Sequence, residues 1–149
     1  MILNSVDETN AFAAEVARDV KVGDIIFLNG ELGAGKTTWT KAFAAALGVV
    51  EPVLSPTFVL GRAYNSGRLP FLHIDAYRLV DLPPKAILQQ LETTELEDYL
   101  EDGVVVVEWG AAIASSFPRR TEINISVGVG VGVDYQNGDV RQVEVVKCS

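Results

Sequence analysis

A glycine-rich stretch in the first third of the chain reads Gly30-Glu31-Leu32-Gly33-Ala34-Gly35-Lys36-Thr37. It matches the pattern Gly-x-x-x-x-Gly-Lys-Thr, in which glycines let successive backbone N–H groups turn inward around a phosphate. The lysine supplies a positive charge for the β- and γ-phosphates, and the threonine hydroxyl suits the coordination shell of Mg²⁺. An apolar run at residues 25–28 precedes the stretch and a helical pattern follows it, so the sequence predicts a strand–loop–helix unit that binds a nucleotide.

The loop and the first turn of the following helix supply the expected phosphate ligands. The predicted nucleotide-binding residues of this segment are Glu31, Leu32, Gly33, Ala34, Gly35, Lys36, Thr37 and Thr38, and Lys36 is also expected to act in catalysis. The Asn-Lys-x-Asp pattern with which GTPases read guanine surrounds none of the lysines. The sequence therefore favours ATP with Mg²⁺ as the bound cofactor.

Two carboxylates follow apolar runs and are candidates for the metal or the attacking water. Asp75 ends the run at residues 71–74, and Glu108 ends the run at residues 104–107. Carboxyl ends of parallel strands open toward the same crevice as a phosphate-binding loop. The residues leave open which carboxylate touches the metal. His73 shares a strand face with Asp75, and the pattern fits a functional histidine and a structural one equally.

Further polar and aromatic side chains allow two interpretations each. Arg78 fits a phosphate contact or a surface ion pair with Asp75. Residues 55–58, which read Ser-Pro-Thr-Phe, fit a loop that senses the γ-phosphate or an ordinary turn. Trp109 fits core packing better than a stacking platform, and Arg141 fits solvent exposure better than a contact with the nucleotide.

Apolar periodicity predicts a single α/β domain over residues 1–149. The expected fold is a P-loop NTPase-like domain with a central, mostly parallel sheet flanked by helices and additional antiparallel strands in the C-terminal third. Asn65-Ser66-Gly67 and Asn137-Gly138 are expected to form hairpin turns. The predicted helices cover residues 6–20, 37–47, 83–91 and 95–101, and the predicted strands cover 25–28, 58–64, 69–75, 104–107 and 123–133, with a last alternating run around 143–145.

Composition restricts the partners and the location. Twelve Lys and Arg residues stand against twenty Asp and Glu residues, which gives a net charge of −8 and argues against a broad nucleic-acid-binding face. One cysteine and one histidine exclude an internal disulfide and a multi-histidine zinc site. The chain shows no signal-peptide pattern and no apolar run of the roughly 18 residues that a membrane span needs. A cytoplasmic protein is expected.

Four motifs in order carry a resemblance to a known family. After the glycine-rich stretch come Ser55-Pro56-Thr57-Phe58, His73-Ile74-Asp75-Ala76-Tyr77-Arg78 and Val107-Glu108-Trp109. Together they resemble the TsaE family of bacterial ATPases. The resemblance implies a single P-loop domain that joins TsaB and TsaD, which attach threonylcarbamoyl to adenosine 37 of tRNA. It also implies that partners hold the tRNA and that ATP hydrolysis supports repeated turnover.

The resemblance also implies roles for individual residues. Thr37 and Glu108 correspond to the Mg²⁺ ligands, and Asp75 to an essential carboxylate near the nucleotide. Thr9, at the start of the first helix, corresponds to a position close to the adenosine. Many relatives have proline after Glu-Trp where this chain has Gly110, which predicts a looser backbone there.

Two other functions share part of the pattern. A small-molecule P-loop kinase fits the loop and the chain length, but such kinases add an arginine-rich lid, and no arginine lies between Arg78 and Arg119. A nucleotide-dependent binding module with negligible turnover has the same motifs as an ATPase. The motifs favour an ATPase that serves tRNA modification, slow without its partners.

Overall fold

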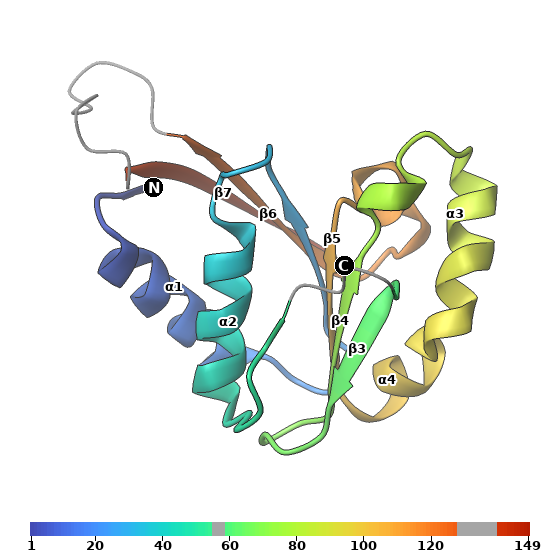
Figure 1. The fold of residues 1–149 in the computed structure, drawn as a ribbon, viewed down its shortest axis with the longest axis horizontal. Helices are drawn as coiled ribbons and strands as arrows, with labels where there is room; N and C mark the ends of the chain where they lie inside the picture. The colour runs from blue at the N-terminus through green and yellow to red at the C-terminus, as the bar shows by residue number, and fades with distance from the viewer. Residues whose placement is uncertain (55–58, 128–139) are drawn as a thin grey trace.

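Residues 1–54, 59–127 and 140–149, which the computed structural model describes, form a seven-stranded sheet with helices on both faces (Figure 1). The strands lie in the order β1-β7-β6-β2-β5-β4-β3. Their bounds are β1 (Ile2–Leu3), β2 (Ile25–Asn29), β3 (Gly61–Tyr64), β4 (Phe71–Asp75), β5 (Val104–Glu108), β6 (Arg120–Val127) and β7 (Arg141–Cys148).

The centre of the sheet is parallel and its edges are antiparallel. β6, β2, β5 and β4 pair in parallel, while β3, β7 and β1 join antiparallel to their neighbours. The predicted mixed α/β sheet is therefore confirmed. In the C-terminal third, β6 and β7 form the expected antiparallel pair, and β6 also pairs in parallel with β2, which the sequence did not predict. Strand alternation alone does not reveal which neighbour a strand will pair with.

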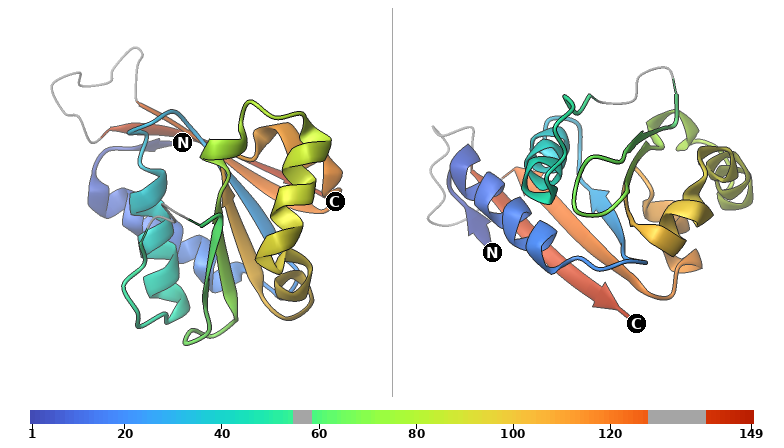
Figure 2. Two further views of the ribbon diagram at one scale, coloured as in Figure 1. Left: turned by 45° about the vertical axis from the view of Figure 1, so that its right-hand side comes forward. Right: turned by 90° about the horizontal axis from the view of Figure 1, so that it is seen from below.

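Alternating residues of the central strands build two separate cores. Ile26 and Leu28 of β2 pack beneath α1 (Val6–Asp19) and α2 (Lys36–Leu47). Ile25 and Phe27 pack on the opposite face against residues of α3 (Pro84–Leu91), α4 (Leu96–Asp102) and the 3₁₀ helix η3 (Ala111–Ser116). Figure 2 shows the sheet between these two helical layers. Burial on both faces explains why β2 and β5 are continuous apolar runs.

The helices begin and end where their sequences provide caps. Ser5 Oγ accepts a hydrogen bond from the Glu8 N–H at 3.1 Å, and Glu8 Oε2 accepts one from the Asn4 N–H at 3.0 Å. The first bond is the N-cap contact that the sequence predicts before α1, whereas the carboxylate of Glu8 reaches the N–H of Asn4, one residue before the N-cap Ser5. α2 ends at Gly48, whose φ of +96° is readily adopted only by glycine.

The remaining differences lie at strand ends. The short strand β1 was not predicted, and it pairs with β7 at Ile2 and Leu3. β6 ends at Val127, while the predicted continuation to residue 133 and the turn at Asn137-Gly138 lie outside the described residues. Within the described ranges, no helix is long and apolar enough to cross a membrane.

Candidate functional site

The loop between β2 and α2 depends on its glycines for conformation and for space. Gly33 and Gly35 have φ values of +81° and +108°, a region that side-chain-bearing residues avoid. Gly30 touches the neighbouring strand, since a Cβ there would lie 2.5 Å from the carbonyl oxygen of Ile125. Gly35 is also the N-cap of α2, so the loop leads directly into the helix end whose N–H groups favour anions.

A cavity of about 400 Å³ lies in front of this loop. Nine of its lining residues were predicted as site residues: Glu31, Leu32, Gly33, Gly35, Lys36, Thr37, Thr38, Asp75 and Glu108; the other two are Trp109 and Arg141. Ala34 is buried within the loop and is not among the lining residues. Thr9 is also buried, in α1, where its hydroxyl donates to the Ser5 carbonyl oxygen at 3.3 Å. The structure thus assembles the predicted loop and carboxylate residues, and a contact of Thr9 with a nucleotide stays a prediction.

Lys36 is folded back onto its own loop. Its Nζ donates to the carbonyl oxygens of Gly30 and Glu31, the latter at 3.1 Å, and lies 3.9 Å from the centre of the Trp109 ring. Burial lowers the pKa of Lys36, while the negative charges of Glu108 and Asp75 act in the opposite direction. The ammonium group is therefore held by neutral carbonyls and an aromatic face, close to two carboxylates.

The two carboxylates meet because of strand register. Asp75 and Glu108 are directly paired residues of the parallel strands β4 and β5. The preceding residues of the same parity, Phe71 on β4 and Val106 on β5, pack into the core on the α1/α2 face. Both carboxylates consequently lie on the face of the sheet that carries α2 and Lys36. The predicted convergence of Asp75, Glu108 and the loop at one edge of the sheet is observed.

The two carboxylates differ in their surroundings. Burial raises the pKa of Asp75; the Tyr77 N–H, which donates to Asp75 Oδ1 at 3.0 Å, opposes this effect, and the nearby charge of Glu108 adds to it. Glu108 is only 3% exposed, and its Oε2 lies 2.5 Å from Nε2 of His73, itself 1% exposed. Asp75 is therefore half-open to the cavity, whereas Glu108 is fixed from behind by a histidine.

His73 is a buried residue bound to the site. Its Nε2 contacts Glu108, and its Nδ1 has no hydrogen-bond partner in the part of the chain that the structure describes. The sequence left a functional and a structural histidine equally open. In the structure His73 is buried, as a structural histidine would be, and it also contacts Glu108, a carboxylate of the cavity.

Trp109 and Gly110 shape the end of β5. Trp109 has a φ of +62°, packs edge-on against Tyr77 with 4.9 Å between ring centres, and lines the cavity. Its indole thus belongs partly to the core, as predicted, and partly to the site. Gly110 has an ordinary negative φ, but a Cβ would lie 2.7 Å from Val107 Cγ1 and 2.9 Å from Phe27 Cδ1. A glycine at this position leaves room for Val107 and Phe27, and the looser backbone expected in place of proline stays a prediction.

Two arginines behave differently from each other. Arg78 is exposed and, among the described residues, forms no ion pair with Asp75. Arg141 was expected in solvent, but it is half-buried and its Nε donates to the carbonyl oxygen of Ala34 at 2.7 Å. No local pattern predicts this contact, which joins residues 107 positions apart. The predicted phosphate-sensing loop, residues 55–58, lies outside the described residues.

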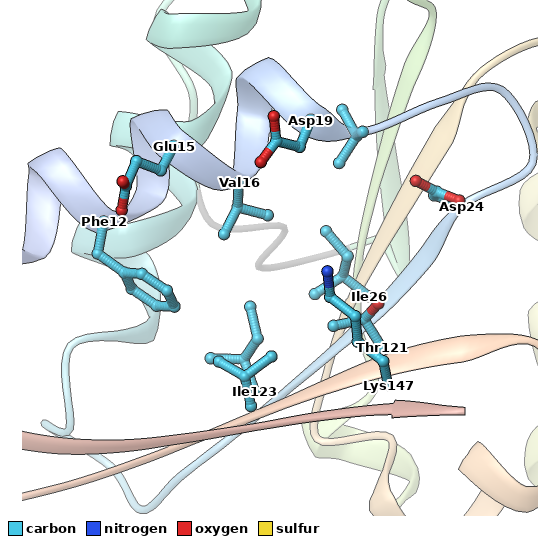
Figure 3. Close-up of a pocket in the computed structure, with 11 residues that line it drawn as sticks. Phe12, Glu15, Val16, Asp19, Asp24, Ile26, Thr121, Ile123 and Lys147 are labelled. Carbon is cyan, nitrogen blue, oxygen red and sulfur yellow. The ribbon is translucent and has the colours of Figure 1, made fainter. Parts of the chain in front are cut away.

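A second cavity, of about 270 Å³, lies between α1 and the strands β2, β6 and β7 (Figure 3). Side chains of α1, such as Phe12 and Val16, face Ile123 of β6 across it, and the exposed carboxylates of Glu15 and Asp19 also line it. It includes no residue of the glycine-rich loop. None of the predicted site residues lines this second cavity.

Fold and site together define a class of protein. It is an α/β protein in which a glycine-rich loop, a lysine and two carboxylates meet at the C-terminal edge of parallel strands. A family model described as "Threonylcarbamoyl adenosine biosynthesis protein TsaE" matches residues 3–131. The chain belongs to the TsaE family, which takes part in the biosynthesis of threonylcarbamoyladenosine in tRNA.

Individual relatives agree with this assignment. The chain is 42% identical to TsaE of Bacillus subtilis over 76% of its own length and 68% of the relative's. It is 37% identical to TsaE of Mycobacterium leprae, over 80% and 76% of the two chains. The crystal structure of Bacillus subtilis YdiB superposes with a TM-score of 0.75 and 30% identity, covering all of this chain and 84% of that one. These relatives favour tRNA modification over the small-molecule kinase.

Proposed function

We propose that this chain is a Mg²⁺-dependent ATPase that supports threonylcarbamoylation of tRNA adenosine. The observation that carries the proposal is the convergence of Lys36, Thr37, Asp75 and Glu108 on one cavity beneath the glycine-rich loop. Membership of the TsaE family supports the role in tRNA modification, and the residues of the cavity support ATP hydrolysis.

The residues present suit ATP and Mg²⁺. At Gly33 a Cβ would meet no atom within 4 Å, so the loop is open on that side, and its left-handed conformation belongs to glycine-rich phosphate cradles. The oxygen donors at the cavity, a threonine hydroxyl and two carboxylates, are the hard ligands that Mg²⁺ prefers. Thr37 and Glu108 would hold the metal, which would neutralise charge that develops on the phosphates.

The other residues of the cavity have separate tasks. Lys36 would leave the carbonyls of Gly30 and Glu31 and contact the β- and γ-phosphates instead, since a hydrogen bond between two charged groups is stronger. The Tyr77 N–H engages Asp75 Oδ1, which leaves Oδ2 to orient the attacking water and accept its proton. Hydrolysis would form a bond between the water oxygen and the γ-phosphorus and break the bond from the γ-phosphorus to the bridging oxygen, so that ADP and phosphate leave.

Other proteins complete the reaction. We infer that TsaB and TsaD bind this chain and that they bind the tRNA. A net charge of −8 suits a subunit that does not itself bind nucleic acid. The expected location is the cytoplasm, where tRNA is modified.

The loop assignment is tested with Lys36→Ala and, as a matched control, Lys41→Ala on the exposed side of the same helix. We expect Lys36→Ala to weaken ATP binding at least roughly tenfold and to abolish hydrolysis, because it removes the charge-assisted phosphate contact. Lys41→Ala should behave like the wild type. Calorimetric titration with ATP and Mg²⁺ measures the affinity, and circular dichroism verifies the fold. Unchanged ATP affinity in Lys36→Ala would refute the assignment.

A further inference from the structure

Arg141 reaches the glycine-rich loop from a distant part of the chain. It is the first residue of β7, and in the antiparallel β6–β7 pair it lies opposite Val127. The last residue of β2, Asn29, pairs with Asn124 of β6. Three further residues of β6, roughly 10 Å at the usual rise per residue, bring Arg141 to the height of the loop beyond β2.

The guanidinium group holds two consecutive carbonyls of the loop. Nε donates to the Ala34 carbonyl oxygen at 2.7 Å, and Nη2 donates to the Gly33 carbonyl oxygen at 3.3 Å. Nη1 donates to the carbonyl of Val140 at 2.9 Å, which anchors the side chain on its own strand. The planar fork of arginine suits such a set of fixed acceptors, which the point charge of lysine cannot reproduce.

These carbonyls belong to the part of the loop that most needs to be fixed. Gly33 and Gly35, the residues with positive φ, flank Ala34. Glycines have wide conformational freedom, so their peptides reorient unless they are held. In a trans peptide the C=O and the following N–H point in opposite directions. Holding the Ala34 carbonyl therefore also sets the direction of the Gly35 N–H, and Gly35 lines the cavity.

We propose that Arg141 is a positioning residue that fixes the peptides after Gly33 and Ala34 in the orientation needed to receive the phosphates of a nucleotide. This inference rests on the proposed function for its ligand, and on the hydrogen bonds alone for the fixed loop. Arg141 lies beyond residue 131, where the match to the family model ends.

The experiment compares Arg141→Met, Arg141→Lys and the matched control Arg120→Met in the full-length chain. Arg120 lies at the other end of the β6–β7 pair, where its Nη1 donates to the Phe117 carbonyl oxygen at 3.2 Å, far from the loop. Amide hydrogen exchange over residues 30–38 is measured without nucleotide. Affinities for ADP and ATP, each with Mg²⁺, are measured by calorimetry.

We expect faster exchange in the loop of both Arg141 variants and not in Arg120→Met. Affinity should fall roughly tenfold for ADP and ATP alike, because two hydrogen bonds from a charged donor are lost and the loop serves both nucleotides. Arg141→Lys keeps the charge and the apolar stem, so it folds even where Arg141→Met does not.

Three results would overturn the inference. The first is wild-type hydrogen exchange and wild-type nucleotide affinity in both Arg141 variants. The second is a loss of affinity for ATP but not for ADP, with unchanged hydrogen exchange. The third is wild-type exchange and affinity in Arg141→Lys. The second would assign Arg141 to the γ-phosphate, and the third would assign its effect to charge. If the wild type binds neither nucleotide, the proposed function fails, while the exchange data still decide the role of Arg141.

Discussion

Single residues of the cavity are held in states that they would not adopt in water. Burial raises the pKa of Asp75 and lowers the pKa of Lys36, so both charged forms are disfavoured by the folded chain. A fold optimised for stability alone would not place these groups here. Ionisable groups that lower the stability of the fold and have perturbed pKa values are typical of functional sites.

Asp75→Asn should stabilise the free protein at neutral pH. A raised pKa in the folded state means that Asp75 contributes stability that is fully present below its unfolded value of 3.8 and lost as the pH rises through the folded pKa. Asparagine mimics the protonated form and can still accept from Tyr77. We expect a higher melting temperature than wild type at pH 7 and no difference below about pH 4.

The control for this experiment is Asp81→Asn, at an exposed position, which should melt like the wild type at both pH values. Thermal unfolding followed by circular dichroism measures the difference. A lower melting temperature for Asp75→Asn at pH 7 would show that the carboxylate stabilises the fold, contrary to this argument. ATP hydrolysis should be lost in the same variant.

At the scale of elements, the ends of β4 and β5 place the two carboxylates side by side in different surroundings. Register places Asp75 beside Glu108, and His73, two residues before Asp75, supports Glu108 from within the sheet. A metal ligand that a buried side chain hydrogen-bonds is better oriented than one on an open surface, and such contacts tune metal affinity. This arrangement favours Glu108 as the metal ligand and Asp75 as the group facing the water.

Glu108→Gln should therefore weaken Mg²⁺ binding more than Asp75→Asn does. We expect the Mg²⁺ concentration for half-maximal ATP binding to rise at least roughly tenfold in Glu108→Gln, because a charged ligand is lost. It should change little in Asp75→Asn. Titration of Mg²⁺ at fixed ATP, followed by a fluorescent nucleotide, measures both. The opposite ranking would reverse the two roles.

The loop shows how far element-level prediction extends. Its strand–loop–helix context and the start of α2 are predicted within one residue, since the glycines, the apolar run and the helix period are all local. The partner of its Gly33 and Ala34 carbonyls was not predicted. That contact depends on β6 lying between β2 and β7, which no local pattern specifies.

At the scale of the whole molecule, the site gathers side chains from most of the chain. The loop, Asp75, Glu108 and Arg141 meet at one end of the sheet, although Arg141 and Ala34 are 107 positions apart. Nucleotide binding there would restrict the motion of segments from both halves of the chain. It could therefore change the affinity of the surface around the cavity for a partner protein.

Association with TsaB and TsaD tests the function of the whole protein. We expect immobilised chain to retain both proteins, and ATP to change the amount retained. The reason is that the cavity proposed to bind ATP is lined by Leu32 of the loop, which is exposed at the surface. Lys36→Ala should associate without responding to ATP. Failure to retain TsaB and TsaD both with and without ATP would count against a role in their complex.

Short stretches of sequence were enough to predict the glycine-rich loop, the two carboxylates that end β4 and β5, the caps of α1 and α2 and the family. Each of these is encoded by residues within a short segment, where glycine conformation, helix period and apolar runs act locally. Only the tertiary structure decided that His73 holds Glu108, that β6 joins the parallel centre and that Arg141 holds the loop. These features depend on strand order and register, which are set by packing both faces of the whole sheet at once.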